Sequence, residues 1–406
     1  MAGIGAHGRS VPWRRGGNRC GALLMHVAVC GPADLSLVAP HLDGPAPPSA
    51  GYRAPIISRL VLGLVERGHR VDLVTLSPEP MDVGRYRGGD LTVLVGPYRP
   101  HRRWADAFRT ERAAVAEAVV ESGADVVHAH WTYEFALGAL RTGLPVVVSI
   151  RDWAPPVFRH RPDHYRAVRL GMQARVLRSS ARFTANSPYL AERATRWTGR
   201  PVRVIPNGIE FPPDPPPAAA AGPPVVVALA NGFGNLKNVA TLLEAFPLIR
   251  RAHPDALLRL AGYDYQPDGP AARWSADRGL GAGVDFVGPL PVGEVATFLG
   301  GGSDLVHPSF EETFGQVILE AIAAGTPVVA GRDAGAVPWV LDGGTSGRLV
   351  DVGSPEAIAA AVVSLLDDPA ASATLARQAF SDASSRFSLD AVVLGFEEEY
   401  KAAIDG

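Results

Sequence analysis

The sequence predicts an α/β protein with two Rossmann-like domains, each built on a doubly wound parallel sheet, that face one another across a cleft. Short runs rich in valine, isoleucine and leucine alternate with helical stretches along most of the 406 residues. This alternation is typical of parallel sheets covered by helices on both faces. A proline-rich segment interrupts the alternation near the middle of the chain. Since a chain of this length also exceeds one compact core, we expect two domains in series.

The first half of the chain contains buried-strand runs with two clear helical stretches between them. Helices are expected at about 54–67 and 105–122, where apolar residues recur with helical spacing. The runs that predict strands are "LLMHVAVCG" (23–31), "HRVDLVTL" (69–76), "LTVLVGP" (91–97), "DVVHAH" (125–130), "LPVVVSIRD" (144–152) and "ARFTANS" (181–187).

The second half repeats the alternation after "PNGIEFPPDPPPAAAAGPP" (206–224), which is too rich in proline for regular structure. The chain closes with helices expected at about 355–380 and 388–404. Strands are predicted at 225–230, 256–262, 284–288, 303–309, 326–331 and 347–351. The predicted units are therefore a disordered leader (1–24), a first domain (25–205), a linker (206–224), a second domain (225–385) and a final helix (386–406).

Composition excludes several classes of function. The formal net charge is −2, so no bulk basic field favours nucleic acid. Cys20 and Cys30 form neither a metal-binding pattern nor a disulfide framework, which fits a reducing compartment. No apolar run reaches the roughly 18 to 20 residues that a membrane span needs. A signal peptide is rejected because 23–31 fits a buried strand and no clean cleavage site precedes it, so we expect a cytoplasmic protein.

The stretch "HPSFEETFGQVILEAIAAGTPVVA" (307–330) carries the main chemical signal. A helix is expected to begin near Phe314 and Gly315, where unpaired N–H groups and partial positive charge favour a phosphate. Gly315 allows the ligand to approach the backbone closely. Glu312 and Glu320, with seven residues between them, stand on either side of this anion site. They suit the hydroxyl pairs of the two sugars in a nucleotide sugar; the alternative is a first-turn acid and a solvated surface residue.

This stretch resembles the E-x7-E signature of the retaining nucleotide-sugar glycosyltransferases of family 4, which have the GT-B fold. Further segments resemble the same family in the expected order, so the resemblance covers roughly 25–404. They are "VERGHRV" (65–71), "DVVHAHW" (125–131), "VIPNGIE" (204–210), "LLEAFPLI" (242–249), "LRLAG" (258–262) and "VDFVGPLP" (284–291). The resemblance implies a first domain that binds the acceptor, a second that binds the donor, and a last helix that crosses back to the first domain.

The resemblance also implies roles for individual residues on the donor side. Glu320 should bind the ribose hydroxyls and Glu312 the hydroxyls of the donor sugar. Backbone N–H groups at Phe314 and Gly315, next to Thr313, should contact the phosphates. Lys237, in "NGFGNLKN" (231–238), matches the lysine that neutralises the diphosphate. Such a cation is needed where no metal serves, because the leaving group is a nucleoside diphosphate.

One position departs from the family pattern. The family usually has an arginine about six positions before this lysine, and this chain has Asn231. Asparagine can donate a hydrogen bond but carries no charge, so a charge-assisted bidentate contact is lost. Either another arginine substitutes, with Arg332 and Arg151 as candidates, or the donor binds more weakly. No Asp-x-Asp metal motif stands in a suitable place, so no metal site is expected.

On the first domain, the resemblance places His130 near the donor sugar as a catalytic residue, together with Glu312 and Lys237; the alternative for His130 is a core histidine at a strand end. Arg151 and Asp152 follow the next strand and should face the cleft. Aromatic side chains could form a floor for the acceptor or belong to the core; these are Trp131, Tyr133 and Trp153. Gly51 alone fits the family's Gly-Gly loop. The basic-aromatic "YRPHRRW" (98–104) could dock on an anionic membrane, but a solvated loop is favoured.

The resemblance implies transfer of a hexose-type sugar from a nucleotide sugar to an acceptor hydroxyl, with retention of configuration and without metal or other cofactor. The acceptor is expected to be a small natural product or an envelope glycan. One alternative is a nucleotide-sugar epimerase on the same fold. Another is a nucleotide-sugar-binding protein impaired in catalysis, for which Asn231 is the only hint.

Overall fold

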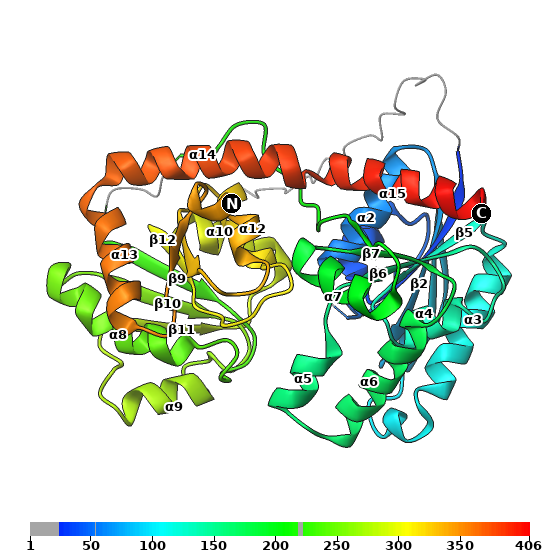
Figure 1. The fold of residues 1–406 in the computed structure, drawn as a ribbon, viewed down its shortest axis with the longest axis horizontal. Helices are drawn as coiled ribbons and strands as arrows, with labels where there is room; N and C mark the ends of the chain where they lie inside the picture. Colours follow the sequence, from blue (N-terminus) through cyan, green and yellow to red (C-terminus); the bar gives the residue numbers. More distant parts are fainter. Residues whose placement is uncertain (1–23, 53, 218–221) are drawn as a thin grey trace, which may run out of the picture.

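The computed structural model describes residues 24–52, 54–217 and 222–406, so the predicted leader lies outside the described residues except for Leu24. Two separate sheets form, one from strands between 26 and 204 and the other from strands between 225 and 350. Figure 1 shows the two α/β units next to each other, each with helices on both faces of its sheet. The predicted fold class is therefore confirmed.

The first sheet has the strand order β3-β4-β2-β1-β5-β6-β7-β8 and is parallel except for β3, which pairs antiparallel with β4. Sequence analysis missed β3, because "GRYRG" is a mostly exposed edge segment without an apolar run. The strands are β1 (His26–Cys30), β2 (Arg70–Ser77), β3 (Gly84–Gly88), β4 (Leu91–Pro97), β5 (Val126–His130), β6 (Val146–Ile150), β7 (Arg182–Ala185) and β8 (Arg203–Val204).

Helices return the chain between these strands, and local sequence signals set their ends. In α7, the Ser187 hydroxyl caps the N-terminus, Pro188 occupies the first turn, and Gly199 ends the helix in the left-handed region. The helices of this domain are α1 (Leu35–Val38), α2 (Pro55–Glu66), α3 (Arg109–Ser122), α4 (Glu134–Ala139), α5 (Ala154–His160), α6 (His164–Leu177) and α7 (Pro188–Thr198). Short 3-10 turns are η1 (Ala39–His41), η2 (Pro80–Asp82) and η3 (Arg103–Asp106).

The second sheet is parallel in the order β11-β10-β9-β12-β13-β14. Its strands are β9 (Val225–Leu229), β10 (Leu257–Ala261), β11 (Val284–Gly288), β12 (Asp304–His307), β13 (Val328–Gly331) and β14 (Arg348–Val350). Its helices are α8 (Val239–Ala252), α9 (Pro270–Ala276), α10 (Val292–Gly300), α11 (Gln316–Ala323), α12 (Val337–Val340), α13 (Pro355–Asp367) and α14 (Pro369–Phe387), with the 3-10 turn η4 (Asp342–Gly344).

The expected helix over 355–380 is wrong: the structure has α13 and α14, bent by 103° relative to each other. Pro369 cannot donate the backbone hydrogen bond that would continue α13, and the Asp368 side chain caps α14 through the N–H of Ala371. Among the described residues, no single helix is long and apolar enough to span a membrane; only this bent pair passes that test, by length and composition.

Both sheets reverse their strand order between neighbouring strands, β1 and β5 in the first sheet and β9 and β12 in the second. Ligands of open α/β sheets bind beyond the carboxyl ends of strands at such reversal points. The loops that follow these strands begin after Cys30, His130, Leu229 and His307. The topology therefore predicts that a ligand binds at these loops.

Two chain segments cross between the domains and bond to each other. Ile209 donates its N–H to Phe387 O at 3.1 Å, and Leu389 donates to Ile209 O at 2.9 Å. Next to this pair, a Cβ on Gly208 would lie 3.0 Å from Leu389 Cα, so any larger residue would push the two segments apart and glycine favours the close approach. The two connections are thus fixed against each other at one point.

The last helix, α15 (Leu389–Ile404), packs on the first domain against α2, β5 and β6, as Figure 1 shows. The Glu397 carboxylate accepts hydrogen bonds from Arg67 Nη2 at 3.1 Å and from His69 Nε2 at 2.8 Å. Burial opposes ionisation of Glu397, but the hydrogen bonds from Arg67 and His69 outweigh it and lower the pKa of the carboxyl group. Tyr400, fully buried on the same helix, bonds to His128 of β5.

Glu397→Ala should destabilise the protein by about 3 kcal/mol, the lower end for removing one partner of a buried ion pair, because Arg67 keeps some contact with water. Urea unfolding at pH 7.5 measures this loss. The control is Glu398→Ala on the next position, whose carboxylate forms a surface pair with Arg203 and should contribute about 0–1 kcal/mol. Equal losses in the two variants would contradict the assignment.

Candidate active site

A cavity of about 1470 Å³ lies between the two domains at the predicted edge of the sheets. The first domain contributes Gly51, Tyr52 and Arg59 to its lining, and the second contributes Asn231, Gly262 and Glu320. These residues follow β1, β9 and β10 or lie on α2 and α11. Helices and loops from both domains therefore enclose one space large enough for a ligand of drug size or more.

The loop after β12 leads into α11, whose first turn has the features of an anion site. Gly315 is the N-cap residue with φ of 92°, a left-handed conformation that favours glycine. Among the described residues, no acceptor bonds the N–H of Phe314 or of Gly315. The Phe314 side chain is buried in the core against Trp339 and Phe387, so only its backbone is available to a ligand. The helix tip thus presents free donors.

Glu312, in this loop, contacts two basic side chains. Its Oε1 atom accepts from Lys237 Nζ at 2.6 Å and is 3.1 Å from His307 Nε2. Burial opposes ionisation of Glu312, but His307 and Lys237 outweigh it and hold the pKa of this carboxyl far below its ordinary value. Sequence analysis missed His307, whose signal was its place at the end of β12, directly before Pro308. In this structure, therefore, Lys237 neutralises Glu312.

Glu320 lies on α11 and lines the cavity, and no cation among the described residues forms a hydrogen bond with it. Burial raises the pKa of this carboxyl, while the charge of Arg59 on α2 and the neighbouring Gln316 side chain act in the opposite direction. The two glutamates consequently differ: Glu312 is firmly ionised and paired, and Glu320 is more weakly compensated. Arg59 was not identified from the sequence, because it comes from the other domain.

Asn231 lines the cavity, and its Oδ1 atom accepts from the Tyr263 N–H at 3.1 Å. This bond leaves the amide nitrogen free to donate. Neither arginine suggested as a substitute lines the cavity. Arg332 is exposed after β13, and Arg151 is buried and bonded elsewhere.

Arg151 fixes the state of His130. Its Nε atom donates to His130 Nδ1 at 3.0 Å, and its Nη1 atom donates to Asn207 Oδ1. Since a guanidinium can only donate, Nδ1 carries no proton and the neutral ring carries its proton on Nε2. Burial, together with the neighbouring His128 and Arg151, lowers the pKa of His130 well below its ordinary value. His130 is thus a neutral donor whose Nε2 atom is buried without a partner among the described residues.

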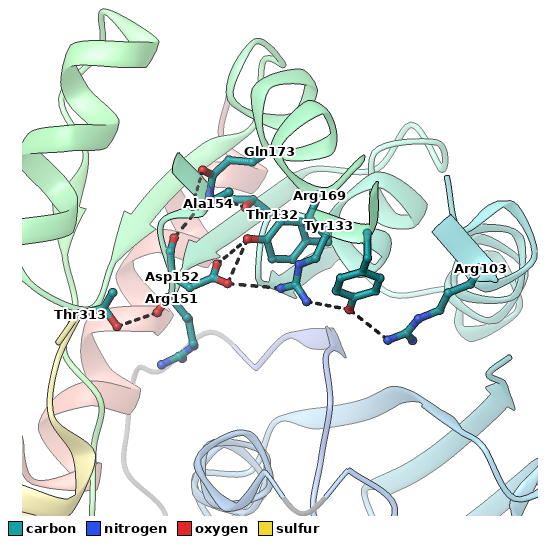
Figure 2. A network of polar contacts seen from close by, with 10 residues as sticks. Arg103, Thr132, Tyr133, Arg151, Asp152, Ala154, Arg169, Gln173 and Thr313 are labelled. Carbon is teal, nitrogen blue, oxygen red and sulfur yellow. Dashed lines mark hydrogen bonds and ion pairs between the residues drawn. The ribbon is translucent and has the colours of Figure 1, made fainter. Parts of the chain in front are cut away.

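The network continues into the second domain. Asn207 donates to Gln316 Oε1 at 3.1 Å, which connects Arg151 to the first residue of α11. Thr313 donates its hydroxyl to Arg151 O at 3.0 Å, and its own carbonyl accepts from the Ser187 hydroxyl at 2.6 Å. Figure 2 shows Thr313 beside the Arg151 backbone. The Thr313 hydroxyl, expected in the donor site, instead holds the loop between β12 and α11 against the first domain.

The three aromatic side chains that could form a floor for the acceptor or belong to the core have different surroundings in the structure. Tyr133 and Trp153 are buried in the core of the first domain, while Trp131 is half-buried. Trp131 has φ of 64°, a strained value for an aromatic residue, directly after His130. Asp152 is half-exposed and accepts from the Tyr133 hydroxyl at 3.0 Å and from Arg169 Nη2 at 3.3 Å, as Figure 2 shows.

The segment 98–104 is not the solvated loop that was favoured from the sequence. Its Arg103 is buried, with the guanidinium 3.8 Å from the centre of the Tyr98 ring. It also donates to the hydroxyls of Tyr52 and Tyr165. His101 and Arg102 remain exposed. Packing on aromatic faces, which suits arginine, brings this basic segment towards the cavity wall at Tyr52.

Comparison with known proteins places both halves of the chain. Residues 56–211 match the family model described as Glycosyltransferase Family 4, and residues 214–382 match the model described as Glycosyl transferases group 1. A D-inositol 3-phosphate glycosyltransferase of Corynebacterium kroppenstedtii is 35% identical over 184 residues, which are 44% of this chain and 40% of that protein. The chain thus spans about two fifths of the length of this relative.

Solved structures show the same fold over nearly the whole chain. Sucrose-phosphate synthase of Thermosynechococcus elongatus superposes with a TM-score of 0.77 at 21% identity, covering 94% of this chain and 99% of that chain. HepE of Anabaena, in a structure with UDP-glucose, superposes with a TM-score of 0.68 at 18% identity, covering 93% of this chain and 100% of that one.

The neutral state of His130 has a measurable effect on stability. A histidine of ordinary pKa in the unfolded chain takes up a proton below pH 6.5, which the folded protein excludes. Stability is therefore lost as pH falls through 6.5, by about 1 kcal/mol per such histidine down to pH 5.5. His130→Gln should therefore reduce the loss of unfolding free energy between pH 6.5 and 5.5 by the amount due to one histidine.

Differential scanning calorimetry at pH 6.5 and 5.5 measures the difference. The matched control is His101→Gln, since His101 is exposed in the loop before η3 and should leave the pH dependence unchanged. If both variants lose stability on acidification as the wild type does, His130 is not held neutral.

Proposed function

Because this chain is a glycosyltransferase with the GT-B fold, we propose that it transfers a glycosyl group from a nucleotide sugar to an acceptor hydroxyl with retention of configuration. The observation that carries the proposal is the tip of α11. Free N–H groups at Phe314 and Gly315, with the Lys237–Glu312 pair beside them, suit a diphosphate that connects two sugars. The neighbour HepE, described with UDP-glucose, supports this class of donor.

Donor binding requires an exchange of partners. Lys237 is occupied by Glu312 in this structure, and a diphosphate that enters at the helix tip would offer Lys237 a second anionic partner. Glu312, with its low pKa, stays ionised and can only accept hydrogen bonds, which suits sugar hydroxyls and excludes a role as general acid. Glu320 on the other side of the tip would take the ribose hydroxyls.

The same arrangement supports a reaction without a metal ion. Negative charge develops on the diphosphate as the glycosidic bond breaks, and Lys237 with the N-terminus of α11 supplies positive charge there. In a front-face reaction, an oxygen of the leaving diphosphate takes the proton of the acceptor hydroxyl that attacks on the same side. The acceptor, a small natural product or a glycan, would then occupy the first-domain wall at Gly51 and Tyr52.

Thermal-shift measurements with a panel of nucleoside diphosphates and their sugars should identify the donor, because a ligand at 100 times its Kd stabilises the folded state by about 2.7 kcal/mol. Transfer with retention would give a product with the anomeric configuration of the donor sugar in NMR spectra. Inversion of the anomeric centre, or conversion of donor alone to an epimer, would contradict the proposal.

Glu312→Ala and Lys237→Ala should each reduce transfer at least 100-fold, the size of effect found when one group that stabilises transition-state charge is removed. The far-ultraviolet circular dichroism of both variants should remain unchanged. Matched controls are Glu244→Ala, on the exposed face of α8, and Lys401→Ala, near the end of α15. Transfer at the wild-type rate in either site variant would refute this site.

A further inference from the structure

We propose that Arg59, on α2 of the first domain, binds the diphosphate of the donor across the cleft and supplies the positive charge that Asn231 lacks. This inference rests on the proposed function and adds a residue to it. Among the described residues that line the cavity, Arg59 is the only basic side chain. The carboxylates of the lining are Asp34, Glu210 and Glu320. Lys237 is not among these lining residues and is paired with Glu312, so Arg59 is the basic side chain that the cavity itself offers to a diphosphate.

The guanidinium of Arg59 is available for a ligand. It makes no hydrogen bond or ion pair with any described residue, so all of its donors are free. Its charge nevertheless reaches Glu320, where it counteracts the effect of burial on that carboxyl. Glu320 lies on α11, the helix whose first turn offers the free N–H groups, and Arg59 lines the same cavity as Glu320.

The sequence folds so that α2 holds Arg59 in place. Ser58, the preceding residue, is buried and exchanges two hydrogen bonds with Asp34 after β1: its hydroxyl donates to Asp34 O at 2.8 Å and accepts from Asp34 N at 3.0 Å. On another face of α2, a Cβ on Gly63 would lie 2.9 Å from Val393 of α15. The helix is therefore fixed both to the loop of the cavity and to the helix that returns from the second domain.

Asn231 and Arg59 line one cavity from different domains, Asn231 from the loop after β9 and Arg59 from α2. Asn231 can donate one neutral hydrogen bond, whereas a guanidinium forms charge-assisted, bidentate contacts with phosphate. The family pattern has a second cation, an arginine, on the second domain at the position of Asn231. In this chain the second cation would be Arg59, on the first domain. Full charge compensation of the leaving group then requires both domains to be together.

The test measures binding of inorganic pyrophosphate by isothermal titration calorimetry, which does not depend on transfer activity. Arg59→Met should weaken this binding about 10- to 100-fold, the effect of losing one hydrogen-bonded charge, and Arg59→Lys should recover part of it. The matched control is Arg70→Met, an exposed arginine at the start of β2, which should bind pyrophosphate as the wild type does.

The double variant Arg59→Met, Asn231→Arg places the cation back on the second domain. It should bind pyrophosphate more tightly than Arg59→Met, and kcat/KM for the donor should recover in parallel. Unchanged pyrophosphate affinity in Arg59→Met overturns the inference, and so does a wild-type kcat/KM in that variant. The two proposals can fail separately. If the wild type transfers no sugar but Arg59→Met still weakens pyrophosphate binding, the proposed function is wrong, while the contact between Arg59 and a diphosphate is supported.

Discussion

The active site depends on one short stretch of chain where the two domains are joined. Ile209 exchanges backbone hydrogen bonds with Phe387 and Leu389 of the returning segment, and Gly208 makes that approach possible. Two residues earlier, Asn207 accepts from Arg151 and donates to Gln316. The segment that connects the domains therefore also connects the end of a first-domain strand to the first turn of α11. A change in the domain arrangement would alter the hydrogen bonds of the site directly.

Most charges of the candidate site are compensated by partners within this structure. Lys237 is neutralised by Glu312, and the cationic Arg151 is directed at neutral acceptors, His130 and Asn207. Buried charges are costly unless they are paired or hydrogen-bonded, which explains why each has a partner. Arg151 is thereby fixed in place by neutral partners, whereas Lys237 would have to exchange Glu312 for an anionic ligand. Arg59 differs, since its guanidinium is left free in the cavity.

Arg151 and Asp152, both expected to face the cleft, have different surroundings in the structure. Arg151 turns inward and donates to His130 Nδ1, which holds the neutral ring in the tautomer with its proton on Nε2. Asp152 instead joins Tyr133 and Arg169 in a cluster that continues to Arg103 (Figure 2). The first-domain wall therefore has a polar and aromatic character of its own, and this is the wall assigned to the acceptor.

The sequence by itself determined the fold class and the order of the strands along the chain, because alternating apolar runs and helices leave few topologies open. It also located the start of α11 to within two residues, from the phenylalanine and glycine that precede Gln316. It did not predict β3, whose residues carry no apolar pattern, or the break between α13 and α14, although Asp368 and Pro369 stood in the sequence as a capping residue and a helix breaker.

Only the tertiary structure decided which side chains meet. His307 and Lys237 are separated by many residues, yet both contact Glu312. Arg59 approaches Glu320 from another domain, and Arg151 turns inward instead of facing the cavity. The local sequence pattern indicates which face of a segment is buried. The partners of a polar side chain depend instead on which distant strands end next to each other at one edge of a sheet. That information arises only when the sheets are assembled and the two domains are brought together.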